Sequence, residues 1–158
     1  MANSVDLVVM RSNSLQYLTA NDWVLIQAKA SRRIYPPGTA ILREGEWPKS
    51  IFIIRRGEAS VELAATGTRT IVASLGPDDI CGEMAFLEQG KATAAVIATT
   101  EEVEVDEVGS HELRALFVAF PGLASRFYQS LSMILAQRLR ETSKELAREM
   151  ALRDRSQK

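Results

Sequence analysis

A glycine–glutamate pair and a nearby run of small residues form the part of this sequence best suited to bind a ligand. The two stretches are Gly82-Glu83-Met84-Ala85 and Ala92-Thr93-Ala94. A carboxylate only accepts hydrogen bonds, so Glu83 is suited to bind hydroxyl or amine donors. Backbone amides that small side chains leave uncovered can form a cradle for an anion. The pattern therefore predicts a binding site for a small ligand.

Catalytic and metal-binding residue types are scarce. The sequence has one histidine, His111, and one cysteine, Cys81. Two or more histidines would be needed for the metal centre of a jelly-roll oxygenase, and no nucleophile–base pair is visible. We therefore expect no enzyme, no catalytic residue, no metal site and no cofactor. A lone cysteine cannot form an internal disulfide, which fits a reducing cytoplasm, and we expect Cys81 to be a buried, inert side chain.

Composition indicates an ordinary soluble domain. The chain has 158 residues, of which 46% are hydrophobic and 25% are charged, and its formal net charge is −1. These values exclude a disordered chain, and the lack of a basic excess gives no indication of nucleic-acid binding. No apolar run approaches the length of about 20 residues that a membrane span needs, and the N-terminus lacks the pattern of a signal peptide. We expect a cytoplasmic protein with no membrane partner.

The middle of the chain has the regularly spaced turn residues that are typical of an all-β unit. All 9 glycines lie between Gly38 and Gly122, and 4 of the 5 prolines lie between Pro36 and Pro77. Short apolar segments alternate with these turn residues, at 40–42, 51–54, 59–63, 70–75, 94–98 and 103–108. Short strands at this spacing predict a sandwich or a jelly-roll barrel.

Helices are expected on both sides of these strands. Thr19 and Asp22 can cap a helix over about 20–30, and Ser110 can cap a second, short one. Pro121 fits the first turn of a third helix of about 30 residues, because no glycine or proline follows Gly122.

The long helix carries a stripe of apolar residues. Leu135, Leu139, Thr142 and Leu146 are spaced as in the seam of a coiled coil. A helix of this length cannot pack wholly against the strands, so we expect its free end to pair with a second copy in a homodimer. The basic residues of the helix are expected to form its solvated face, and they are Arg138, Arg140, Lys144, Arg148, Arg153 and Arg155.

Four motifs occur together in the order and at the spacing of a known family. They are Gly38-x-x-Ile41-x-x-Glu44-Gly45-Glu46, Phe52-x-Ile54-x-x-Gly57-x-x-x-Val61, Leu75-Gly76-Pro77-Asp78-Asp79, and Cys81–Ala85 with Gly90–Val96. From about residue 15 to 145 the chain resembles the cyclic-nucleotide-binding domain family, the sensor domain of the catabolite activator protein and the fumarate-nitrate regulator. The resemblance implies a mainly β fold, a β-roll or double-stranded β-helix jelly roll. It further implies a short N-terminal helix and a long C-terminal dimerisation helix.

The resemblance also implies two domains and a role for each candidate site residue. Residues 1–120 would form the roll and its N-terminal helix, and residues 121–158 the helix for dimerisation and signal output. Glu83 matches the glutamate that accepts a hydrogen bond from the ribose 2′-hydroxyl, and Thr93 matches the small residue that faces the cyclic phosphate. Thr142-Ser143 matches the pair that contacts adenine from both chains of a dimer. The candidate ligand-binding residues are thus Gly82, Glu83, Met84, Ala85, Ala92, Thr93, Ala94, Thr142 and Ser143.

The sequence departs from the family at Ala92, where the family carries the arginine that pairs with the phosphate. Losing that charge-assisted contact should cost about 2–5 kcal/mol, or roughly 30-fold to several-thousand-fold in affinity. The side chain of Lys91 should point away from the phosphate-binding stretch at 92–94. Three hypotheses follow: a sensor that binds cAMP or cGMP weakly and signals through its long helix; a degenerate homologue that serves as a dimerisation or protein-interaction module; and a pocket with changed ligand chemistry.

We expect no DNA-binding unit after the long helix in this chain. Only residues 153–158 remain there, whereas a helix-turn-helix needs two further helices. We therefore expect a stand-alone sensor or a fragment of a larger regulator.

Overall fold

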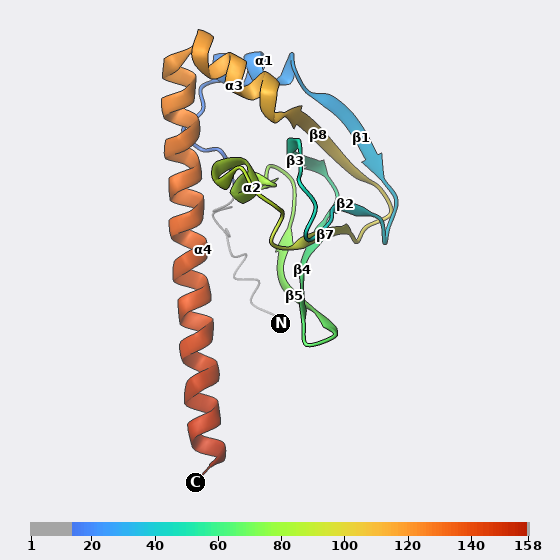
Figure 1. Cartoon of the computed structure of the whole chain (residues 1–158), viewed down its shortest axis with the longest axis vertical. Coiled ribbons are helices and arrows are strands. Elements are labelled where there is room, and N and C mark those ends of the chain that lie inside the picture. Colours follow the sequence, from blue (N-terminus) through green and yellow to red (C-terminus); the bar gives the residue numbers. More distant parts are fainter. Residues whose placement is uncertain (1–13, 158) are drawn as a thin grey trace, which may run out of the picture.

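Two four-stranded antiparallel sheets form the body of the protein. The structure is a computed structural model that describes residues 14–157 (Figure 1). The sheet orders are β1-β8-β3-β6 and β2-β7-β4-β5. The strands are β1 (Ser31–Tyr35), β2 (Ala40–Leu42), β3 (Ser50–Arg56), β4 (Ala59–Ala65), β5 (Thr68–Leu75), β6 (Ile80–Cys81), β7 (Ala95–Ala98) and β8 (Val103–Gly109). The expected jelly-roll fold is confirmed. The first 13 residues of the expected 1–120 domain lie outside the described range.

Strand β3 separates two hydrophobic cores. Alternate side chains of a strand point to opposite faces, so Phe52 and Ile54 lie inside the roll with Val103 and Val105 of β8. Ile51 and Ile53 point the other way and pack against the helices. Burial on both faces explains why the segment around Ile53 is apolar without alternation.

Four helices complete the described chain: α1 (Ala20–Gln27), α2 (Glu83–Glu88), α3 (Ser110–Ala119) and α4 (Pro121–Ser156). The expected capping box of α1 is present, with Thr19 and Asp22 as its members. Pro121 occupies the first turn of α4, as expected. Ser110 is the first residue of α3 and not its cap, because the N-cap position belongs to Gly109.

Helix α4 has 36 residues and packs against the roll only along its first half. Its buried side chains end at Ile134, whereas Leu139 is 68% exposed and Leu146 is 57% exposed. In Figure 1 the helix passes beside the roll and extends well beyond it. The apolar stripe is therefore uncovered within a single chain, as the sequence led us to expect.

Strands β1 and β6 were not expected. Strand β1 is exposed along most of its length and pairs with β8 so that Arg32 lies opposite Asp106 and Arg33 lies next to Glu107 in space. The Arg32 Nε–Asp106 Oδ1 distance is 2.6 Å, and the Arg33 Nε–Glu107 Oε2 distance is 2.8 Å. Ion pairs with β8, and not a buried apolar face, thus attach β1 to the sheet.

Candidate functional site

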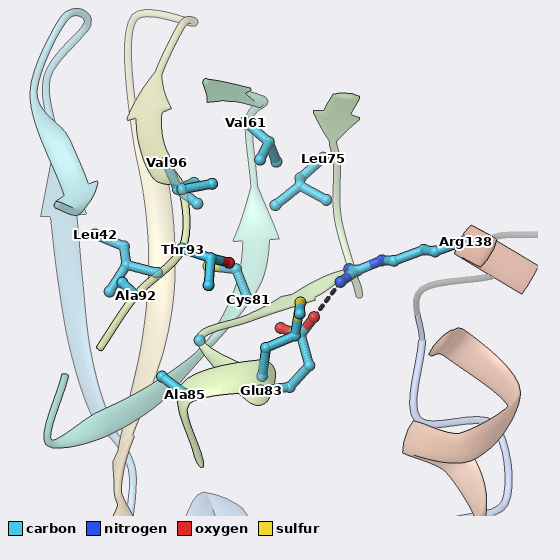
Figure 2. A pocket seen from close by; sticks show the side chains of 13 residues that line it. Leu42, Val61, Leu75, Cys81, Glu83, Ala85, Ala92, Thr93, Val96 and Arg138 are labelled. Atoms are coloured by element: carbon cyan, nitrogen blue, oxygen red, sulfur yellow. Dashed lines mark hydrogen bonds and ion pairs between the residues drawn. The ribbon is translucent and has the colours of Figure 1, made fainter. Parts of the chain in front are cut away.

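A cavity of about 80 Å³ lies between the β2-β7-β4-β5 sheet, helix α2 and helix α4 (Figure 2). The residues that line it are Leu42, Val61, Leu75, Cys81, Gly82, Glu83, Met84, Ala85, Ala92, Thr93, Ala94, Val96 and Arg138. The structure thus brings together every predicted residue of the 82–85 and 92–94 stretches.

Gly82 places the glutamate at the cavity. It is the N-cap residue of α2 and has a φ of 82°, a left-handed conformation that favours glycine. A Cβ atom at this position would lie 3.2 Å from the Ser50 carbonyl oxygen, so a larger residue would press on β3. Glu83 then becomes the first residue of α2 and is only 3% exposed. A buried carboxylate of this kind requires hydrogen-bond donors.

Arg138 of α4 is the donor that Glu83 has in this structure. Its Nη1 donates to Glu83 Oε1, and its Nη2 donates to the Ile80 carbonyl oxygen at 3.2 Å. Figure 2 shows the Arg138 side chain reaching from α4 to the carboxylate. The expectation that Arg138 belongs to the solvated face of the helix is therefore wrong, because its side chain is only 28% exposed and is held by two acceptors.

An aromatic cluster holds α2 in place. Phe86 lies edge-on to Phe117 and Phe127, with ring centroids 6.3 and 6.0 Å away. The Arg114 guanidinium lies 4.4 Å from the centre of the Phe86 ring, and its Nη2 donates to the Phe86 carbonyl oxygen at 3.1 Å. These contacts pack α2 against α3 and α4 and so fix the position of Glu83, the first residue of α2.

Ala92 contributes a methyl group to the wall where the family resemblance led us to look for a charge. It is 5% exposed, its N–H donates to the Glu46 carbonyl oxygen at 2.8 Å, and its carbonyl oxygen accepts from the Gly45 N–H at 2.8 Å. Lys91 is exposed and is not part of the cavity lining. The charged side chains in the lining are thus Glu83 and Arg138.

Thr142 and Ser143 are not brought to the cavity within one chain. Both are exposed, and neither is part of its lining. Arg138, about one helical turn before Thr142, reaches the cavity instead. No local signal in the sequence distinguished this residue from the exposed arginines of the same helix, because its contact with Glu83 joins positions 55 residues apart.

Cys81 is buried in the roll core and lines the cavity, in agreement with its expected role as an inert side chain. Burial raises the pKa of its thiol, and the nearby Glu83 carboxylate raises it further. The thiolate, which is the reactive form, is therefore disfavoured.

Two further features were looked for in residues 14–157, a cluster of metal-ligating side chains and a helix that could span a membrane. No group of three or more histidine, cysteine, aspartate or glutamate side chains is placed there to hold a metal ion. None of the helices in that range combines the length and the apolarity needed to cross a bilayer.

Comparison with known proteins gives a consistent result. A model of the cyclic nucleotide-binding domain family matches residues 32–119. Cyclic GMP-binding protein C of Dictyostelium discoideum is 34% identical over 82% of this chain and 5% of its own length. The cyclic AMP receptor protein of Thermus thermophilus is 32% identical over 73% of this chain and 51% of its own length. The chain thus spans about half of the second relative and a small part of the first.

Solved structures share the fold. The crystal structure of the Thermus thermophilus catabolite activator protein has a TM-score of 0.70 and 28% identity, covering 82% of this chain and 59% of that one. The c-di-GMP-responsive regulator of Xanthomonas campestris has a TM-score of 0.75 at 22% identity, with coverage of 82% and 64%.

Proposed function

Because this chain belongs to the cyclic nucleotide-binding domain family, we propose that it is a sensor module that binds a cyclic nucleotide, cAMP or cGMP, in the Glu83 cavity. The observation that carries the proposal is the Glu83–Arg138 ion pair, which joins the cavity to α4. A ligand hydroxyl that bonds to Glu83 changes the surroundings of the one α4 side chain in the cavity lining. Ligand binding and the position of the helix are then coupled, which is what a regulatory module requires.

Binding of either cyclic nucleotide should be weak. Ala92 offers no charge to the phosphate, and the only cation in the lining, Arg138, already pairs with Glu83. We expect a dissociation constant in the high-micromolar range or weaker, on the order of 4–6 kcal/mol of binding free energy. The module would act by changing its conformation and not by catalysis.

Signal output would use the region 121–158, with the 1–120 region as the sensor. Leu139 and Leu146 are exposed on α4, and burial of such a stripe against a second copy would give a parallel homodimer. In that dimer Thr142 and Ser143 of one copy would approach the ligand held by the other. A base between the roll and the helix would then contact both chains.

A second candidate is a dimerisation or protein-interaction module that has lost its ligand. The methyl group of Ala92 in the cavity wall and the uncovered stripe of α4 favour it. The two candidates differ in whether a ligand reaches the helix.

Hydrogen exchange with and without millimolar cAMP distinguishes them, provided that calorimetry on the same samples establishes binding. The sensor should show slower amide exchange over residues 141–150 when the ligand is bound, because that segment is exposed in the single chain. The variant Glu83→Gln is the control and should lose both binding and the slowed exchange. Equal exchange in bound and free samples would favour the interaction module.

A further inference from the structure

The cavity that holds Glu83 has a charge balance that bears on its ligand. We infer that it binds an uncharged molecule with vicinal hydroxyls on an apolar or aromatic body, of which a nucleoside is the representative, more tightly than a cyclic nucleotide. This inference rests on the proposed function, because it assigns the ligand class of the same cavity.

The two charges of the lining neutralise each other. Glu83 and Arg138 are its only charged residues, and they form an ion pair. The second Nη of Arg138 is directed to the backbone carbonyl of Ile80 at 3.2 Å. The cation is therefore oriented by two acceptors of the protein itself.

An anionic ligand would disturb this balance in either of two ways. It would lie in the cavity without a cation, or it would draw Arg138 away from Glu83. The second course leaves a carboxylate that is 3% exposed without its charged partner. Both an unpaired buried anion and a broken buried pair are costly.

The other side chains of the wall offer no charge to a phosphate. Ala85, Ala92 and Ala94 contribute small apolar groups to the lining. The backbone amide of Ala92 is already donated to the Glu46 carbonyl oxygen. The lysine beside it, Lys91, is exposed and outside the lining.

A neutral diol fits the same groups without breaking the pair. The two oxygens of a carboxylate have about four acceptor sites, so Glu83 can accept from two ligand hydroxyls and keep Arg138. Thr93 supplies a hydroxyl to the lining. An aromatic body has the apolar surface of the strands to contact, formed by Leu42, Val61, Leu75 and Val96.

Calorimetry tests the inference with adenosine, guanosine, their 2′-deoxy forms, cAMP and cGMP, each at two salt concentrations. The better nucleoside should bind at least about tenfold more tightly than its cyclic nucleotide, since 1.4 kcal/mol corresponds to a factor of ten, and its affinity should not depend on salt. The 2′-deoxynucleoside should bind more weakly, because it lacks one of the two hydroxyls. Ala92→Arg should reverse the order, whereas Ala92→Gln, of similar length and no charge, should not.

The outcomes separate this inference from the proposed function. Wild-type protein that binds a cyclic nucleotide as tightly as the nucleoside overturns the inference and leaves the proposed function standing. Wild-type protein that binds no nucleoside, with cyclic nucleotide binding restored by Ala92→Arg, also overturns it. If neither protein binds any probe while circular dichroism shows both to be folded, the inference and the proposed function fail together.

Discussion

Arg126 holds Asp22 with two hydrogen bonds, from Nε to Oδ2 at 2.6 Å and from Nη2 to Oδ1 at 2.7 Å. Asp22 lies on α1 and its side chain is 2% exposed, whereas Arg126 lies near the start of α4. Further along the same helix, Arg138 pairs with Glu83 of α2. Two arginine–carboxylate pairs therefore attach α4 to the rest of the molecule, with the buried residues Phe127, Leu131 and Ile134 between them.

The Asp22 pair should make stability depend on pH in the acid range. The hydrogen bond from Arg126 is the main reason why the pKa of Asp22 is lowered from 3.8 to about 2. A folded-state pKa below the unfolded one stabilises the protein above pH 4, and this contribution is lost as the pH falls towards 2. Asp22→Asn should reduce the free energy of unfolding at pH 7 by about 1–2 kcal/mol, less than the full shift implies because solvent screens the partly exposed Arg126.

Urea denaturation of both proteins between pH 7 and pH 2 measures this difference. The free energies of unfolding of wild type and variant should converge as the pH falls. A constant difference over the whole range would show that the ion pair is not its cause.

Removal of Arg138 should destabilise the fold because it leaves Glu83 buried without its cation. We expect Arg138→Met to lower the free energy of unfolding by about 1–3 kcal/mol, and the double variant with Glu83→Gln to recover part of the loss. Urea denaturation at one fixed protein concentration gives the coupling energy of the pair. Lys144→Met on the exposed part of α4 is the control and should stay within about 0.5 kcal/mol of wild type. A coupling energy near zero would contradict the assigned contact.

Introducing the missing charge at the cavity wall should improve cyclic nucleotide binding. Ala92 lines the cavity, so the guanidinium of Ala92→Arg can pair with a phosphate there. Calorimetry should give a binding free energy for cAMP or cGMP that is more favourable than in wild type by about 2–5 kcal/mol. If the arginine variant is folded but still binds neither cyclic nucleotide, the 82–85 and 92–94 stretches have lost the shape of the site as well as its charge.

The apolar stripe of α4 should hold two copies together. Leu139 is 68% exposed and lies on that stripe, so Leu139→Glu should convert a dimer into a monomer. Sedimentation at tens of micromolar protein tests this, with Lys144→Glu, off the stripe, as the control that should remain dimeric. The idea is wrong if wild type and Leu139→Glu are both monomers.

The sequence predicted the strands whose side chains have a local pattern. Strands β2, β3, β4, β5, β7 and β8 contain short apolar or alternating segments between turn residues, and each lies within a few residues of the expected segment. Strand β1 has no such pattern, since its partners Asp106 and Glu107 lie more than seventy residues further along the chain. Strand β6 consists of Ile80–Cys81 alone, which is too short to give an alternation.

The same distinction applies to the site. Four motifs in register predicted the residues of the 82–85 and 92–94 stretches, because they share short loops with the glycines that shape them. Arg138 has the same residue type as its exposed neighbour Arg140, and only a contact 55 positions away distinguishes the two. Contacts of this range depend on the packing of α4 against the roll, which no local pattern describes.

The uncovered part of α4 has a mechanical consequence. Residues 139–156 are exposed throughout. They form a helical arm of about 27 Å that begins directly after the Arg138 contact. A tilt of the arm by about 10° at the Arg138 contact would displace its far end by about 5 Å, which is nearly the rise of one helical turn. Under the proposed function, a small change of hydrogen bonding at Glu83 would thus be amplified along the part of the helix that extends beyond the roll (Figure 1).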